Sequence, residues 1–453
     1  PGNNLGMKLD NFSVKTIGGV LTIGSAALGP SGGKGIGSFT LPTGFIQTGT
    51  TLHGLTLGDL KTYGNVTVAQ NALNNANGGV LNFPISINIG GLYGSGTTNL
   101  TAKNVTFQFP GITTQNAPVS LLVGSAVAGY SSAVATGSTA TSVLGLTGGI
   151  TTNGGAVTLG AGNGITATAA PINTSGGDVT VINTPPLNNA SAASIVFNTA
   201  SAINAGTGNV TVRNGPLAVQ AGLGAITLGT LTGKNITIHN NLSDSSATNT
   251  NNVTLNGALT ASGPIDISSD SGDISVAANQ VTTLTSAIAH PINMTAGRNI
   301  TLNTGANILS AGGGAATVSL IAGKKYSSAL QVNGAITTSG GNLNLFNLQT
   351  GNLTSSGNLT LGGGSLNLYS PGSNSLSGII AGTNSNLNLL SRTDASLLSY
   401  APTAANGVTT ISGANTYTGS TTIDQGTLIA SHATALGANT AAGATVNTSG
   451  ILL

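Results

Sequence analysis

The chain has few side chains that could do chemistry, and the strongest candidates are its acidic residues. Enzymes that cleave polysaccharides use clustered carboxylates, often beside an Arg or Lys. The single acidic cluster is Asp266, Asp270 and Asp273. Asp266 lies between two aliphatic residues of an expected strand and should point outward, whereas Asp270 and Asp273 flank a Ser-Gly turn, where Asp bonds local amides. A structural role is favoured; catalysis and a calcium site remain as alternatives for these three residues.

Other reactive groups show no productive spacing. The histidines His53, His239, His290 and His432 lie far apart and share no metal-ligand spacing. The glycine-rich stretch 32–35 lacks the Ser or Thr that a phosphate-binding loop needs after its Lys. The chain has no Cys, which excludes disulfides and cysteine metal sites. We therefore predict that the protein is not an enzyme and holds no cofactor or metal.

One short repeated phrase defines the elements that position these residues. A Gly or Asn precedes an aliphatic residue, a Thr or Asn, and a second aliphatic residue, as in 209–212, 235–238, 252–255 and 299–302. This alternation predicts a short, half-buried β-strand, and the flanking Gly, Asn, Ser and Asp predict turns. Because such a strand cannot bury its apolar face alone, copies recurring at roughly 20 residues must stack, which indicates a β-solenoid.

The composition supports an all-β fold. The 453 residues include 69 Gly but only 4% charged and 3% aromatic residues, and no Glu. Because Glu, Lys and Arg are typical of helix surfaces, their scarcity argues against helices. A net charge of +2 gives no basic patch, so a nucleic-acid partner is not expected.

The pattern divides the chain into three regions. Residues 1–140 form an irregular N-terminal β region, in which bulky side chains either cap a solenoid end or fill the cores of ordinary coils. Residues 141–400 carry the regular coils, and residues 401–453 a sharper repeat. Within 341–368, Asn recurs between aliphatic residues, so we expect Asn side chains of successive coils to bond one another. The Phe residues of this region are Phe12, Phe39, Phe45, Phe83, Phe107 and Phe109.

The sequence of the regular coils resembles a known repeat. The stretches 272–276 and 297–302 look like the glycine-polar-aliphatic-polar-aliphatic coils of filamentous haemagglutinin-type proteins. This resemblance covers about half of the chain.

The stretch 411–429 resembles the autotransporter-associated β-strand repeat more sharply. The resemblance implies an exported passenger that folds as a right-handed parallel β-helix. No outer-membrane barrel follows Leu453 and no signal peptide precedes Pro1, so we expect a trimmed, cleaved or truncated form, or export by a separate outer-membrane transporter. The matching positions are Gly413, Asn415, Thr416, Tyr417, Gly419, Thr421, Ile423, Gly426, Thr427 and Leu428.

These observations predict an extracellular, structural or adhesive β-solenoid of a bacterial cell surface. Its expected partners are a host or neighbouring cell surface, a glycan or a matrix. One alternative is a filament subunit whose copies stack end to end, since open strand edges can pair with further strands. A polysaccharide-acting enzyme on the same fold is a second, less favoured alternative.

Overall fold

The computed structural model describes residues 118–123, 144–185, 193–216, 220–244, 251–283, 290–311, 315–391, 407–438 and 442–453, with the backbone of the strands before residue 118. Every regular element among them is a β-strand, and none is a helix able to cross a membrane. The chain divides into two compact units, residues 1–234 and 235–453, which we describe separately.

Unit 1 is a stack of coils whose strands pair in parallel with the equivalent strands of the next coil. Each regular coil supplies one strand to each of three columns. The first column contains β10 (Val80–Asn82), β13 (Thr106–Phe109), β16 (Leu144–Leu146), β19 (Ile165–Ala167), β22 (Ile195–Phe197) and β26 (Ile226–Leu228). The second contains β7 (Leu60–Thr62), β11 (Ser86–Ile89), β14 (Gly111–Thr114), β17 (Ile150–Thr151), β20 (Ile172–Asn173), β23 (Ile203–Asn204) and β27 (Leu231–Gly233). The third contains β1 (Met7–Lys8), β4 (Phe39–Leu41), β8 (Val66–Val68), β12 (Thr98–Ala102), β15 (Val119–Val123), β18 (Val157–Ala161), β21 (Val179–Asn183) and β24 (Val210–Asn214).

Six further short strands belong to unit 1. They are β2 (Val14–Thr16), β5 (Ile46–Thr48) and β9 (Leu73–Asn74), which pair with one another, the pair β3 (Leu21–Ile23) and β6 (Leu55–Leu57), and β25 (Gln220–Ala221). The side chains of the predicted N-terminal cap, including its Phe residues, lie outside the described residues.

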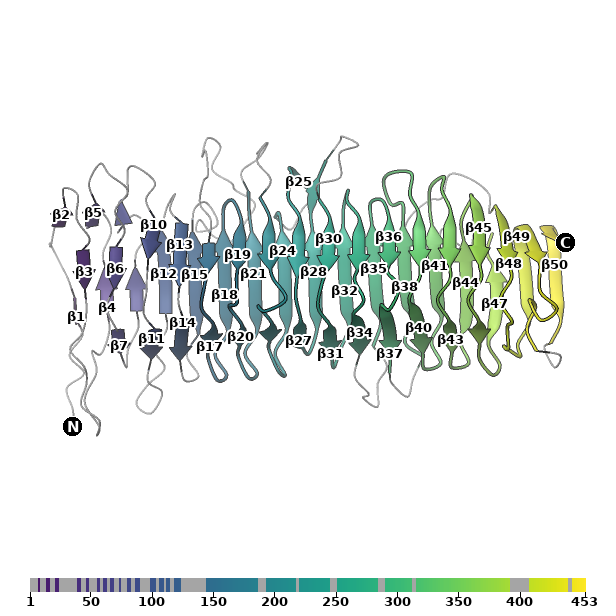
Figure 1. Ribbon diagram of the computed structural model, residues 1–453, viewed down its shortest axis with the longest axis horizontal. Helices are drawn as coiled ribbons and strands as arrows, with labels where there is room; N and C mark the ends of the chain where they lie inside the picture. Colours follow the sequence, from purple (N-terminus) through teal and green to yellow (C-terminus); the bar gives the residue numbers. More distant parts are fainter. Residues whose placement is uncertain are drawn as a thin grey trace. The chain divides into compact units, whose positions relative to one another are not determined.

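Unit 2 repeats the three-column plan, as its strands show in Figure 1. The first column contains β30 (Val253–Leu255), β33 (Ile274–Val276), β36 (Ile300–Leu302), β39 (Leu330–Val332), β42 (Leu353–Ser355), β45 (Ser373–Leu376) and β48 (Val408–Ile411). The second contains β31 (Leu259–Ala261), β34 (Gln280–Thr283), β37 (Asn307–Ser310), β40 (Ala335–Thr338), β43 (Leu359–Leu361) and β46 (Ile380–Ala381). The third contains β28 (Ile236–Asn240), β32 (Ile265–Ser269), β35 (Ile292–Ala296), β38 (Val318–Ala322), β41 (Leu343–Asn347), β44 (Ser365–Tyr369), β47 (Asn386–Leu389), β49 (Thr421–Ala430) and β50 (Ala444–Leu452). The two-residue strand β29 (Leu242–Ser243) follows β28.

The core of each unit is a stack of aliphatic side chains at matching positions. In the third column of unit 2, for example, Ile265 pairs with Ile292 and Ile292 with Val318, and all three are fully buried. Side chains at the alternate positions point outward, as the period of two requires. Burial of these apolar surfaces is the main force that holds successive coils together.

Stacked glycines let the coils approach closely at the turns. A Cβ on Gly378 would lie 2.0 Å from the carbonyl oxygen of Gly357, and one on Gly413 would lie 2.2 Å from the carbonyl oxygen of Gly378. No side chain fits at these distances, so the glycine content follows partly from the stacking. The prediction of a parallel β-helix is confirmed.

Candidate functional site

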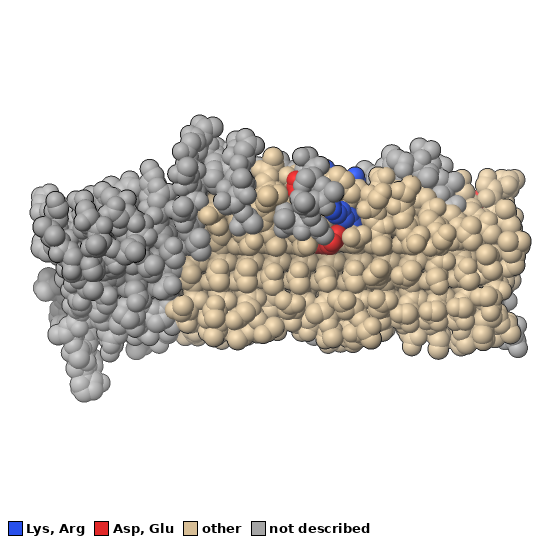
Figure 2. Space-filling view, turned by 45° about the horizontal axis from the view of Figure 1, so that its top comes forward, with Lys and Arg blue, Asp and Glu red and all other residues tan. Residues whose placement is uncertain are grey.

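The described basic side chains of unit 2 gather in one place. Among its described residues, the Lys and Arg side chains are Arg298, Lys324 and Lys325. Arg298 and Lys325 lie over the ring of Tyr326, and both lysines contact Asp270. Figure 2 shows charged side chains concentrated in a small area of a largely uncharged face. We call Ser243, Asp244, Asp270, Arg298 and Lys324–Tyr326 the charged cluster.

The loop after β38 presents Lys324, Lys325 and Tyr326 of the charged cluster. The chain turns at Gly323, whose φ of 77° falls in the left-handed region that favours glycine. The following amides then donate to carbonyl groups of the preceding coil: Lys324 N–H to Ala296 at 3.0 Å and Tyr326 N–H to Gly297 at 2.9 Å. The loop therefore lies against the corner of the coil before it.

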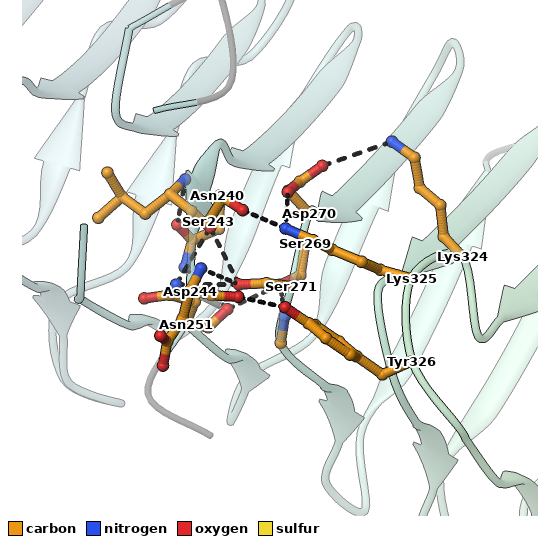
Figure 3. A network of polar contacts seen from close by, with 12 residues as sticks. Asn240, Ser243, Asp244, Asn251, Ser269, Asp270, Ser271, Lys324, Lys325 and Tyr326 are labelled. Atoms are coloured by element: carbon orange, nitrogen blue, oxygen red, sulfur yellow. Dashed lines mark hydrogen bonds and ion pairs between the residues drawn. The ribbon is translucent and has the colours of Figure 1, made fainter. Parts of the chain in front are cut away.

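From this loop the side chains extend toward two earlier coils, as Figure 3 shows. The Lys325 ammonium donates to the Ser243 hydroxyl and lies 3.4 Å from Oδ2 of Asp270. The Lys324 ammonium lies 3.7 Å from Oδ1 of the same carboxylate. The Tyr326 hydroxyl donates to the main-chain carbonyl of Asp244.

Two cations flank the Tyr326 ring. The Arg298 guanidinium carbon lies 4.8 Å from the ring centroid and the Lys325 ammonium 5.5 Å from it, both within cation–π range. Arg298 Nε also donates to the carbonyl of Ser271 at 3.1 Å. Arg298 is thus bonded to the coil before its own while it stacks on a residue of the coil after.

The structure separates the three acidic residues that the sequence grouped together. Asp266 points outward, as predicted, and its Oδ2 lies 2.9 Å from Nε2 of His239. Asp270 contacts the two lysines of the charged cluster. Oδ1 of Asp273 accepts from the main-chain and side-chain nitrogens of Asn299, both at 3.0 Å, so this carboxylate bonds the next coil.

Each of these carboxylates therefore has a partner of its own. Within the described part of the chain, no group of three or more His, Cys, Asp or Glu side chains is placed to hold a metal ion. The described histidines belong to no such group either. His239 pairs with Asp266, and His432 Nδ1 lies 3.1 Å from the Thr434 hydroxyl. His53 lies outside the described residues.

A second feature of unit 2 is a column of outward amide groups on its third set of strands. Asn344 donates to the Ser319 hydroxyl at 3.1 Å, Asn367 donates to Asn344 at 2.8 Å, and Asn388 donates to Asn367 at 2.9 Å. The four residues, Ser319, Asn344, Asn367 and Asn388, occupy matching positions of successive coils. The predicted bonding between Asn side chains in this stretch is confirmed, and we call these residues the amide column.

The sequence did not predict a further role for the polar residue before each strand. Asn252 Oδ1 accepts from the main-chain N–H of Asp273 at 2.9 Å, and Asn299 Oδ1 accepts from that of Ala329 at 2.7 Å. Asp273 makes the equivalent bond to Asn299. These residues were interpreted only as turn formers, but they also join consecutive coils. The regular spacing of Asn and Asp before the aliphatic pair was the available signal.

The C-terminal motif residues also hold coils together. The buried Asn415 accepts from the Ile380 N–H at 2.8 Å and donates to the Ala435 carbonyl at 2.7 Å, so it connects segments on either side in sequence. Tyr417 is fully buried, and its hydroxyl lies 2.6 Å from that of Thr421. Burial raises the pKa of Tyr417 above its usual 10.0, and the hydrogen bond to Thr421 opposes that rise.

The remaining motif positions differ in burial and in their contacts. Ile423 and Leu428 are core residues, and Thr416 is exposed. A Cβ on Gly419 would lie 2.4 Å from the Ser385 carbonyl oxygen, and Gly426 has a φ of 93°. The Thr427 N–H donates to the carbonyl of Gly407 at 3.0 Å.

Comparison with protein-family models, curated proteins and solved structures gives no match.

Proposed function

We propose that this protein is an extracellular structural and adhesive component of a bacterial cell surface, and that it binds uncharged polysaccharide. The amide column carries this proposal. Side-chain amides and hydroxyls can both donate to and accept from sugar hydroxyl groups. Their regular placement on successive coils offers a chain-like ligand the same contacts at intervals of about 4.8 Å.

The placement of the three carboxylates that the sequence grouped favours binding over catalysis. Glycoside hydrolysis needs two carboxyl groups on opposite sides of the scissile bond. The carboxylates of Asp266, Asp270 and Asp273 are instead each bonded to a different partner. The resemblance of residues 411–429 to the autotransporter-associated repeat supports an exported protein, with an outer-membrane transporter as the export partner.

The test is retention of the purified chain on immobilised neutral polysaccharides and on bacterial or host cells. Replacing Asn344, Asn367 and Asn388 together by Ala should weaken retention at least about tenfold, because several hydrogen bonds of about 1 kcal/mol each are lost. Gln331→Ala is the matched control, because Gln331 is an exposed amide of the first column of strands. Equal retention of the triple variant and wild type, with both folded, would refute a role for the amide column.

A further inference from the structure

We infer that the charged cluster is a clamp that couples four consecutive coils of unit 2, so that these coils open as one cooperative block. In a solenoid each coil normally contacts only its immediate neighbours, and stability is a sum of coil and nearest-neighbour terms. A contact that reaches across several coils breaks this rule. The charged cluster contains such contacts.

The register shows how far the clamp extends. β28 pairs with β32, β32 with β35, and β35 with β38, so β28 and β38 are three coil steps apart, or about 14 Å at 4.8 Å per step. Lys325 and Tyr326 follow β38, whereas Ser243 and Asp244 follow β28. Their side chains nevertheless meet, because Lys325 donates to Ser243 and Tyr326 donates to Asp244.

The two intervening coils are tied into the same contacts. The coil of β32 supplies Asp270, which lies between the clamp lysines, and the coil of β35 supplies Arg298, which stacks on Tyr326. Asp270 is well shielded, since its side chain is only 13% exposed. Each of the three earlier coils thus holds at least one side chain or carbonyl group that the loop 323–326 of the fourth coil contacts.

The local backbone supports the clamp. A Cβ on Gly323 would lie 2.3 Å from the Ser328 hydroxyl oxygen, so the turn that directs the loop backward admits no larger residue without rearrangement. The Gly323 N–H donates to the Arg298 carbonyl at 2.8 Å, which fixes the start of the loop. The loop is therefore held in place before its side chains reach the earlier coils.

The test asks whether a disturbance in the first coil of the block reaches the fourth. Leu242 is fully buried beside β28, and Leu242→Ala removes core contacts there. Hydrogen exchange of β38 amides is then measured with the clamp intact and in the Lys325→Ala/Tyr326→Phe double variant. With the clamp intact, Leu242→Ala should speed β38 exchange about tenfold; in the double variant it should leave β38 exchange unchanged.

Two further measurements keep the inference falsifiable. Gln331→Ala, an exposed change after β38, should not alter the effect of Leu242→Ala on hydrogen exchange of the β38 amides. If Leu242→Ala gives no folded protein, Leu242→Val introduces a smaller defect at the same site. The inference would be overturned if Leu242→Ala did not speed β38 exchange while the clamp is intact. It would also be overturned if Leu242→Ala sped β38 exchange equally with and without the clamp.

Discussion

At the scale of single residues, polar side chains in this protein mainly join one coil to the next. Asn415 bonds a main-chain N–H on one side and a carbonyl on the other. Asn252 and Asn299 accept from amides of the following coil. An amide suits this role because it carries both a donor and an acceptor without charge, so it can be buried without the cost of an ion.

Tyr417 gives a residue-scale prediction with a pH dependence. At neutral pH, Tyr417→Phe should lower the free energy of unfolding by about 1 kcal/mol, because the Thr421 hydroxyl loses its buried partner. Burial raises the pKa of Tyr417 in the folded state above 10.0, so above about pH 10 the unfolded chain loses this proton while the folded chain keeps it. The stability that Tyr417 contributes is therefore constant below that pH and falls as the pH rises further.

The measurement is urea unfolding of both proteins from about pH 8 to about pH 11. The difference in unfolding free energy between wild type and Tyr417→Phe should shrink at the alkaline end. Other tyrosines and lysines titrate equally in both proteins, so their contribution cancels. A difference that stays constant over this range would contradict the assigned burial effect.

The residue types could be recognised from the sequence, but their partners could not. The Asn residues before the strands were expected to form turns, and their bonds to the next coil required the register. The bonding within the amide column was predictable because Asn recurs at the same place in neighbouring phrases. The partners of Asp266, Asp270 and Asp273 were not predictable. These residues are close in sequence, but they lie at different points of the coil and so meet different neighbours.

At the scale of strands and turns, the period of two predicted the strands and their inward faces well. The period of two did not predict the burial of one outward position near the end of β38, β41 and β44. Ile321, Phe346 and Tyr369 occupy this outward position, yet they are at most 6% exposed, because they pack on one another and on Leu348 outside the coil. Alternation alone cannot reveal a second apolar layer outside a strand.

The stacked glycines give a prediction at the same scale. Gly378→Ala should lower unfolding free energy by more than about 2 kcal/mol, because the new methyl would lie 2.0 Å from the Gly357 carbonyl oxygen and the coils must separate. Denaturant unfolding measures the change. Ser375→Ala, an exposed change three residues earlier, should remain within about 0.5 kcal/mol of wild type. Equal stabilities of the two variants would show that the glycine stacking is not limiting.

The clamp lay beyond sequence-based prediction. Lys325 and Asp270 are 55 residues apart and Lys325 and Ser243 are 82 apart, so no local pattern connects them. Coil lengths vary along the chain, and a contact across three coils depends on all of them. The only signal in the sequence was the small number of charged residues, which made the position of each Lys and Arg informative.

At the scale of the whole molecule, a long chain with little charge can be stable because each coil adds the same kind of contact. A solenoid grows without thickening its core, and its continuous backbone ladders supply stability without disulfides. The outer surface in the described part of the chain is mostly Asn, Thr, Ser and Gly, which matches a protein that binds through many weak, uncharged contacts.

The most direct test of the proposed function measures binding and turnover in the same tube. Purified protein is incubated with insoluble neutral polysaccharide, and both the protein retained on the solid and the sugar released into solution are quantified. We predict retention that the Asn344, Asn367 and Asn388 triple Ala variant loses, with no released sugar. Release of soluble oligosaccharide would contradict a purely adhesive role, and an absence of retention on every surface offered would contradict adhesion itself.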